Sequence, residues 1–83
     1  MQIKYFASIR ERVGRNDETR ELPRSITTVA DLLDHLSAED ESYAIAFADR
    51  ETLRAALDQE HVELDAPLGA AREIALFPPM TGG

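Results

Sequence analysis

The chain has 83 residues and a mass of 9.2 kDa, which is enough for one small domain and too little for two. Apolar residues make up 43% and charged residues 30%, a balance that argues against an intrinsically disordered or fibrous protein. The net charge of -7 disfavours nucleic acid and anionic membranes as partners, because both are negatively charged. The sequence has neither a run of about 20 apolar residues nor a basic leader, so we expect a soluble, cytoplasmic protein.

The absence of cysteine restricts the chemistry that the chain can perform. It removes disulfides, thiolate nucleophiles and thiolate metal ligands. His35 and His61 match no metal-ligand spacing, so we predict no metal site. Neighbouring carboxylates such as Asp40 and Glu41 come without a nucleophile or a pocket, and we interpret them as solvated surface. We therefore expect the chain alone to have no turnover.

The N-terminal segment predicts two strands and a short helical turn. Period-two alternation over Gln2–Ser8 indicates a strand. Its core-facing residues are expected to be Ile3, Tyr5 and Ala7. Residues 9–13 fit a helical turn before Gly14, and Glu18–Leu22 favours a second strand antiparallel to the first.

The most regular helical pattern covers Val29–Ala38. Thr28 and Asp31 have the spacing of a capping box, in which a hydroxyl and a carboxylate accept hydrogen bonds from backbone N–H groups. Apolar residues at helical spacing form one face, which comprises Val29, Leu32, Leu33 and Leu36. The following segment, Tyr43–Phe47, fits either a helical turn or an apolar connection.

Three further strands are expected in the C-terminal half. Leu53–Leu57 is alanine-rich and fits a helix by propensity, but it also alternates as a strand does, and we favour the strand. His61–Leu64 predicts a short strand after a turn. Ile74–Phe77 predicts the last strand, which Pro78 and Pro79 end because proline cannot donate to a ladder.

Strand alternation places two aromatic rings on the sheet face that the main helix leaves open. If Ile3 and Tyr5 face the helix, Phe6 faces away from it. The same alternation in the last strand directs Phe77 outward. Two rings on one sheet face predict a protein-docking patch, unless a loop covers them.

These elements predict an α+β fold of ββαββ order with small extra elements, in which one main helix packs across a mixed sheet. The domain is expected to span residues 1–77, followed by an uncharged tail of residues 78–83. The last two residues of the tail, Gly82 and Gly83, have no Cβ, so the tail can enter a channel too narrow for other residues. A frayed chain end is the plain alternative.

Two stretches of sequence resemble one family. The start, FASIRE over residues 6–11 with Gly14, and the end, FPPMTGG over residues 77–83, resemble the sulfur-carrier small subunits of molybdopterin synthase, a ubiquitin-like β-grasp family. The resemblance spans the whole chain and agrees with the ββαββ order. Its Gly-Gly end alone is shared with other carriers and modifiers, whereas the preceding Phe-Pro-Pro-x-Thr is more specific.

The resemblance implies a sulfur carrier. An ATP-dependent activating enzyme would adenylate the Gly83 carboxylate, and a sulfur donor would then replace AMP to leave a C-terminal thiocarboxylate. The larger synthase subunit would use this sulfur to convert cyclic pyranopterin monophosphate into molybdopterin, and two loaded carriers would act in turn. The resemblance implies no permanently bound cofactor.

The resemblance also implies a heterotetramer of two small and two large subunits. The tail residues expected to thread into the large subunit are Pro78, Pro79, Met80, Thr81 and Gly82. The docking surface would be the outer sheet face with Phe6 and Phe77. His61 stands where the family usually has a larger apolar or aromatic residue and would lie at the rim, or else be an ordinary solvated histidine.

Three other interpretations stay open. A sulfur carrier of the thiamine pathway would share the Gly-Gly end, but such carriers lack the Phe-Pro-Pro-x-Thr segment that precedes it here. A ubiquitin-like modifier would form isopeptide bonds through Gly83 and appear as lysine conjugates of higher mass. For an inert interaction module, removal of Gly82 and Gly83 would change nothing.

Overall fold

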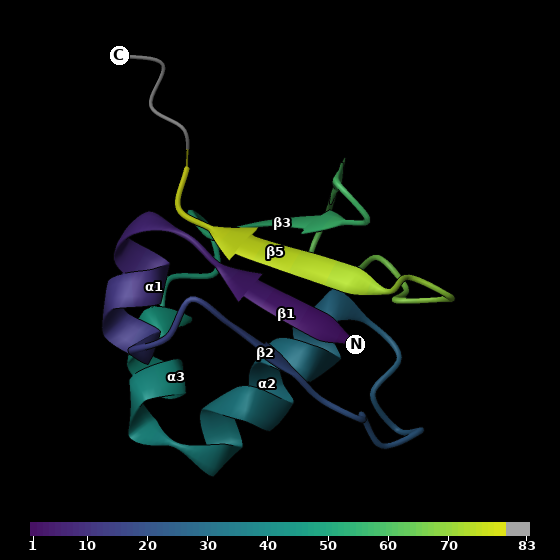
Figure 1. The fold of residues 1–83 in the computed structure, drawn as a ribbon, viewed down its shortest axis with the longest axis horizontal. Helices are drawn as coiled ribbons and strands as arrows, with labels where there is room; N and C mark the ends of the chain where they lie inside the picture. The colour runs from purple at the N-terminus through teal and green to yellow at the C-terminus, as the bar shows by residue number, and fades with distance from the viewer. Residues whose placement is uncertain (80–83) are drawn as a thin grey trace.

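The computed structural model describes residues 1–79, which form one sheet with helices on one of its faces (Figure 1). The elements of these residues, in chain order, are β1 (Gln2–Tyr5), α1 (Ala7–Val13), β2 (Asp17–Thr19), α2 (Val29–Glu39), α3 (Glu41–Ala46), β3 (Arg54–Leu57), β4 (Glu60–Val62) and β5 (Glu73–Phe77). The strand order in the sheet is β2-β1-β5-β3-β4. Strands β1 and β5 are parallel and the other neighbours antiparallel, so the predicted α+β class with a mixed sheet is confirmed.

Strand β1 is shorter than predicted because the backbone leaves the extended conformation at Ala7. Ala7 has φ 51°, in the left-handed region, and begins α1. The prediction that Ala7 faces the core was therefore wrong, and its side chain is exposed. The predicted helical turn is present as part of α1, which ends at Gly14 with φ 89°, a conformation that suits glycine.

Strand β2 pairs antiparallel with β1, as predicted, but ends before Leu22. The first residue of β1, Gln2, lies opposite Thr19, so the ladder ends there. The backbone N–H of Arg20 still donates to the Met1 carbonyl at 2.9 Å, which closes this edge of the sheet.

The main helix, α2, is confirmed together with its capping box. The Asp31 backbone N–H donates to Thr28 Oγ1 at 3.1 Å, and the Thr28 N–H donates to Asp31 Oδ2 at 3.1 Å. The residues of its buried face are Val29, Leu32, Leu33 and Leu36. Of the two possibilities for residues 43–47, the structure shows a helix, α3. The Asp40 carboxylate caps its first turn by accepting a hydrogen bond from the Ser42 N–H at 2.8 Å.

The segment that could have been helix or strand is the strand β3, as favoured. Ala55 lies opposite Leu76 on one side and Val62 on the other, so sheet pairing on both edges decides the conformation against the helical propensity of alanine. Strand β4 begins one residue earlier than predicted because Asp58 and Gln59, with φ 47° and 71°, make a tight turn. Leu64 falls outside it, and its carbonyl accepts from the Ala30 N–H at the start of α2.

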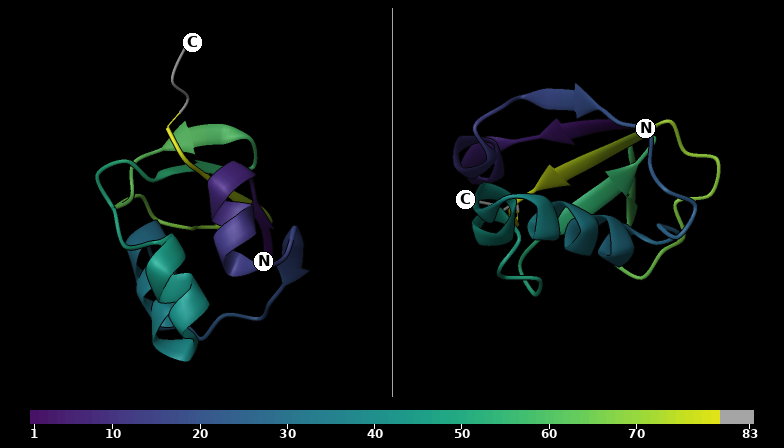
Figure 2. Two further views of the ribbon diagram at one scale, coloured as in Figure 1. Left: turned by 90° about the vertical axis from the view of Figure 1, so that its left-hand side faces the viewer. Right: turned by 90° about the horizontal axis from the view of Figure 1, so that it is seen from below.

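One face of the sheet is covered and the other is open. Figures 1 and 2 show α2 and α3 across the covered face, with α1 beside the end of β1. The largest fully buried side chains come from the strands, from α2 and from the residue after α3, and they are Tyr5, Phe47, Ile3, Leu32, Leu33, Leu36, Ile74, Leu76 and Val29. The open face carries the alternate residues of the same strands, which is where the candidate site lies.

A polar cluster around Glu18, which we call the Glu18 cluster, joins the sheet edge to α3. The Glu18 carboxylate accepts hydrogen bonds from Tyr5 Oη at 2.7 Å, from Arg20 Nε at 2.7 Å and from Tyr43 Oη. Burial opposes ionisation of Glu18, but the hydrogen bonds from Tyr43, Arg20 and Tyr5 prevail and hold the pKa of this carboxyl below its usual value. Burial and the nearby Glu18 carboxylate raise the pKa of the Tyr5 and Tyr43 hydroxyls, so both hydroxyls stay protonated and act as donors.

Candidate functional site

An apolar groove lies where β5 leaves the sheet, on the open face. It has a volume of about 540 Å³. Its lining residues come from β4, β5, the start of α1 and the segment after β5, and they are Phe6, Ala7, His61, Ala75, Phe77, Pro78 and Pro79. Within residues 1–79, His61 is the one lining side chain that can carry a charge. The groove therefore contrasts with the rest of a chain whose net charge is -7.

The period of β5 determines which of its residues reach the groove. Ile74 and Leu76 are fully buried under the helices, whereas Ala75 and Phe77 are half-buried and point to the open face. This outward position of Phe77 was predicted from the alternation. Ala75 lies on the same face, and its small side chain leaves room for the groove between larger neighbours.

Phe6 lies on the open face although it is not part of the strand. β1 ends at Tyr5, and Phe6 is the residue that precedes α1. Its backbone keeps extended dihedral angles, φ -127° and ψ 152°, so the alternation of side chains continues for one residue beyond the strand. The Phe6 N–H donates to the Leu76 carbonyl at 3.1 Å, which fixes it beside β5, and its side chain is 46% exposed.

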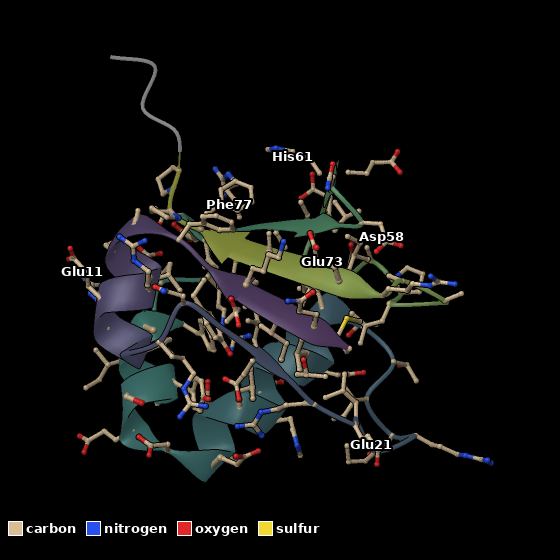
Figure 3. All side chains as sticks on the ribbon, viewed as in Figure 1. Glu11, Glu21, Asp58, His61, Glu73 and Phe77 are labelled. Atoms are coloured by element: carbon tan, nitrogen blue, oxygen red, sulfur yellow. The ribbon has the colours of Figure 1, made fainter. Side chains whose placement is uncertain are left out.

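His61 and Phe77 are in direct contact across the sheet. Their ring centroids are 5.3 Å apart and the rings meet edge to face at 69°. Figure 3 shows both side chains rising from the open face of the sheet. Because the His61 ring stands against one side of Phe77, that phenyl ring is half-buried, whereas His61 itself is exposed. The structure thus brings together the three side chains proposed from the sequence as a docking surface.

A second hollow lies on the other side of His61 and differs from the groove in charge. It has a volume of about 840 Å³. Its charged lining residues are Arg50, Glu51, Arg54, Glu63 and Asp65. The Arg50 and Arg54 guanidinium groups are occupied, the first by the Phe47 carbonyl and the Asp34 carboxylate and the second by backbone carbonyls of residues 51 and 53. His61 therefore forms the border between an apolar and a charged depression.

Two kinds of feature are missing from the described part of the chain. Among residues 1–79, no group of three or more His, Asp or Glu side chains is placed to hold a metal ion. No helix of those residues is both long and apolar enough to span a membrane. The remaining tail residues singled out from the sequence lie outside the described residues, and they are Met80, Thr81, Gly82 and Gly83.

Comparison with known proteins places the chain in a family. The model of the ThiS family matches residues 3–83. The chain belongs to the ThiS family. The molybdopterin synthase sulfur carrier subunit of Escherichia coli (strain K12) is 37% identical to this ThiS-family chain over 83 residues, covering 100% of the chain and 99% of that protein. The protein of the same name from Mycosarcoma maydis is 33% identical, covering 100% of the chain and 92% of that protein.

Solved structures of similar fold extend this assignment. SAMP1 of Haloferax volcanii superposes with a TM-score of 0.71 at 27% identity, covering 100% of this ThiS-family chain and 98% of that one. The fold is therefore the β-grasp of ubiquitin-like proteins, as the sequence resemblance implied. The two stretches that carry the sequence resemblance, residues 6–11 and 77–83, contribute Phe6, Ala7, Phe77, Pro78 and Pro79 to the lining of the groove.

Proposed function

We propose that this chain is the sulfur carrier subunit of a molybdopterin synthase and that it carries sulfur as a thiocarboxylate on Gly83. The observation that carries the proposal is the 37% identity to the Escherichia coli subunit of that name across the full length of both proteins. The groove supports the proposal, because Phe77, Pro78 and Pro79 line it and precede the Gly-Gly end in the sequence.

The chemistry proceeds on the Gly83 carboxylate. A carboxylate is a poor electrophile, so an activating enzyme first joins it to AMP from ATP and releases pyrophosphate. A sulfur donor then displaces AMP, and the product is a C-terminal thiocarboxylate whose anionic sulfur is the nucleophile. The chain has no cysteine that could compete for the activated carbonyl. The thiocarboxylate sulfur attacks cyclic pyranopterin monophosphate, and hydrolysis of the resulting thioester leaves the sulfur on the pterin and returns the Gly83 carboxylate. Two loaded carriers supply the two sulfurs of molybdopterin. ATP is bound by the activating enzyme, and the carrier holds no permanent cofactor.

The catalytic subunit of the synthase is the main partner in this proposal. It docks on the open sheet face, where Phe6, Phe77 and His61 meet. Exposed aromatic rings in an uncharged groove are typical of interface residues that contribute most of the binding free energy. The tail segment of residues 78–83 then enters the catalytic subunit. Two carriers and two catalytic subunits form a heterotetramer in the cytoplasm.

The direct test is the intact mass of the chain after incubation with the activating enzyme, ATP and a sulfur source. A mass increase equal to the exchange of one oxygen for sulfur, mapped to Gly83, is the expected result. Omission of ATP is the matched control and leaves the mass unchanged. An unchanged mass in the complete reaction, with an activating enzyme shown to consume ATP, would contradict the carrier role.

A ubiquitin-like modifier is the second candidate, and the likeness to a solved modifier favours it. Small archaeal modifier protein 1 of Haloferax volcanii has a TM-score of 0.69 and 26% identity to this chain. A modifier transfers the activated Gly83 carbonyl to lysine amines of other proteins. Covalent conjugates of higher mass in the native cell, lost when Gly83 is removed, would support this candidate over the sulfur carrier.

A further inference from the structure

His61 gives the docking groove a titratable group that its other lining residues lack. Those other residues carry apolar side chains, and they are Phe6, Ala7, Ala75, Phe77, Pro78 and Pro79. A surface that fits this groove closely must itself be apolar and uncharged, since a charged group would lose water without gaining a partner. The groove therefore selects an uncharged apolar segment of the catalytic subunit as its occupant.

Within residues 1–79, the His61 imidazole has no carboxylate at ion-pair distance. Charged side chains occur on the strands of the sheet and around the second hollow: Glu60 on β4, Arg54 on β3, Lys4 on β1, Glu73 on β5, and Arg50, Glu51, Glu63 and Asp65 around the hollow. Lys4 and Glu73 pair with each other at 3.1 Å. None of the ion pairs within residues 1–79 includes His61. Its charge is therefore solvated by water, which docking removes.

We propose that His61 makes docking of the catalytic subunit depend on a neutral imidazole, so that docking weakens as the pH falls. This inference rests on the proposed function. Histidine is the side chain that ordinarily changes charge between about pH 5 and 8. The neutral ring can pack against Phe77 beneath an apolar partner, whereas the imidazolium would be buried without an ion-pair partner among residues 1–79.

The sign of the effect follows from linkage. The undocked chain binds a proton at His61 more readily than the docked chain, so docking releases that proton. Affinity is then highest at alkaline pH and falls on acidification, by at most about tenfold per pH unit for the one proton released.

The test is calorimetric titration of the full chain with the catalytic subunit at about pH 8 and about pH 5.5. We expect the wild-type affinity to fall about tenfold between these two pH values. In His61→Leu and His61→Gln the affinity should change only as much as it does for reasons common to all variants. His35→Gln is the matched control, because His35 lies on α2 and pairs with Glu39 outside the groove, so it behaves as wild type. His61 is exposed, and circular dichroism verifies that its variants fold.

Each result bears on one of the two proposals. Absence of wild-type binding at pH 8 contradicts the proposed function. Binding at pH 8 with a pH dependence that His61→Leu retains, or that the wild type lacks, overturns the role of His61 alone. A wild-type affinity that rises on acidification overturns it as well and indicates an acidic occupant. Repeating the titration near pH 6.5 in buffers of different ionisation enthalpy measures the released proton directly, which His35→Gln keeps and His61→Leu loses.

Discussion

Tyr5 Oη donates a 2.7 Å hydrogen bond to Glu18 Oε2. This bond joins a fully buried tyrosine of β1 to the edge strand β2. Tyr43 of α3 donates to the same oxygen, and Arg20 Nε donates to the other. One carboxylate thus ties two strands and a helix together. Converting this carboxylate to an amide replaces one acceptor oxygen with an NH2 donor and leaves at least one of these donors unpaired. The Glu18 cluster is therefore the clearest target for a stability test.

We expect Glu18→Gln to lower the free energy of unfolding at neutral pH by about 1–3 kcal/mol, because a charged acceptor of several hydrogen bonds is lost. The pKa of Glu18 is lowered in the fold, so its contribution is present above the pKa of the unfolded chain and is lost as the pH falls through the folded value. Urea unfolding between about pH 7 and pH 3 should show a steeper loss for the wild type than for Glu18→Gln. Glu21→Gln, at an exposed glutamate, is the control and should follow the wild type.

Ala7→Gly should leave stability unchanged or raise it by up to about 1 kcal/mol, because Ala7 has φ 51° and glycine adopts this conformation without the clash of a Cβ. The matched change Ala38→Gly, at an exposed position in α2, should lower stability by about 0.5–1 kcal/mol. Thermal unfolding of both variants gives the comparison. Equal losses would contradict a left-handed backbone at Ala7.

Phe6→Ala should weaken docking of the catalytic subunit by about tenfold or more, because an exposed aromatic residue beside an apolar groove is a typical interface hot spot. The control is Ile45→Ala, which truncates an equally exposed apolar side chain, 54% accessible, on α3. Calorimetric titration at about pH 8 measures both affinities. If Ile45→Ala weakened docking and Phe6→Ala did not, the partner would bind the helical face instead.

Removal of Gly82 and Gly83 should abolish sulfur loading and leave the fold intact. The buried core of the described residues ends at Leu76, and the two glycines have no side chain that could fill a core. Intact mass after the activation reaction measures loading, and circular dichroism with thermal unfolding measures the fold. Loss of structure would show that the tail has a structural role, and retained loading would show that Gly83 is not the acceptor.

The sequence by itself determined the elements whose signals are local. The capping box of Thr28 and Asp31, with four apolar residues at helical spacing behind it, predicted α2 almost to the residue. The alternation in β5 predicted which of its residues are buried, and hence that Phe77 faces outward. These predictions are correct because each pattern depends on residues close together in sequence: the capping box marks where a helix begins, and the apolar period indicates which side chains are buried.

The boundaries and the site were decided by tertiary structure. Leu53–Leu57 could be read as helix or strand, and only pairing with β5 and β4 on both sides selected the strand. The positive φ of Ala7 ended β1 early, which no residue type at that position predicts. His61 and Phe77 are distant in sequence and meet because β3 pairs with both of their strands, β4 and β5. The Glu18 cluster likewise joins residues that share no local pattern. Contacts between distant segments depend on how the sheet is ordered, so their chemistry becomes visible only once the chain has folded.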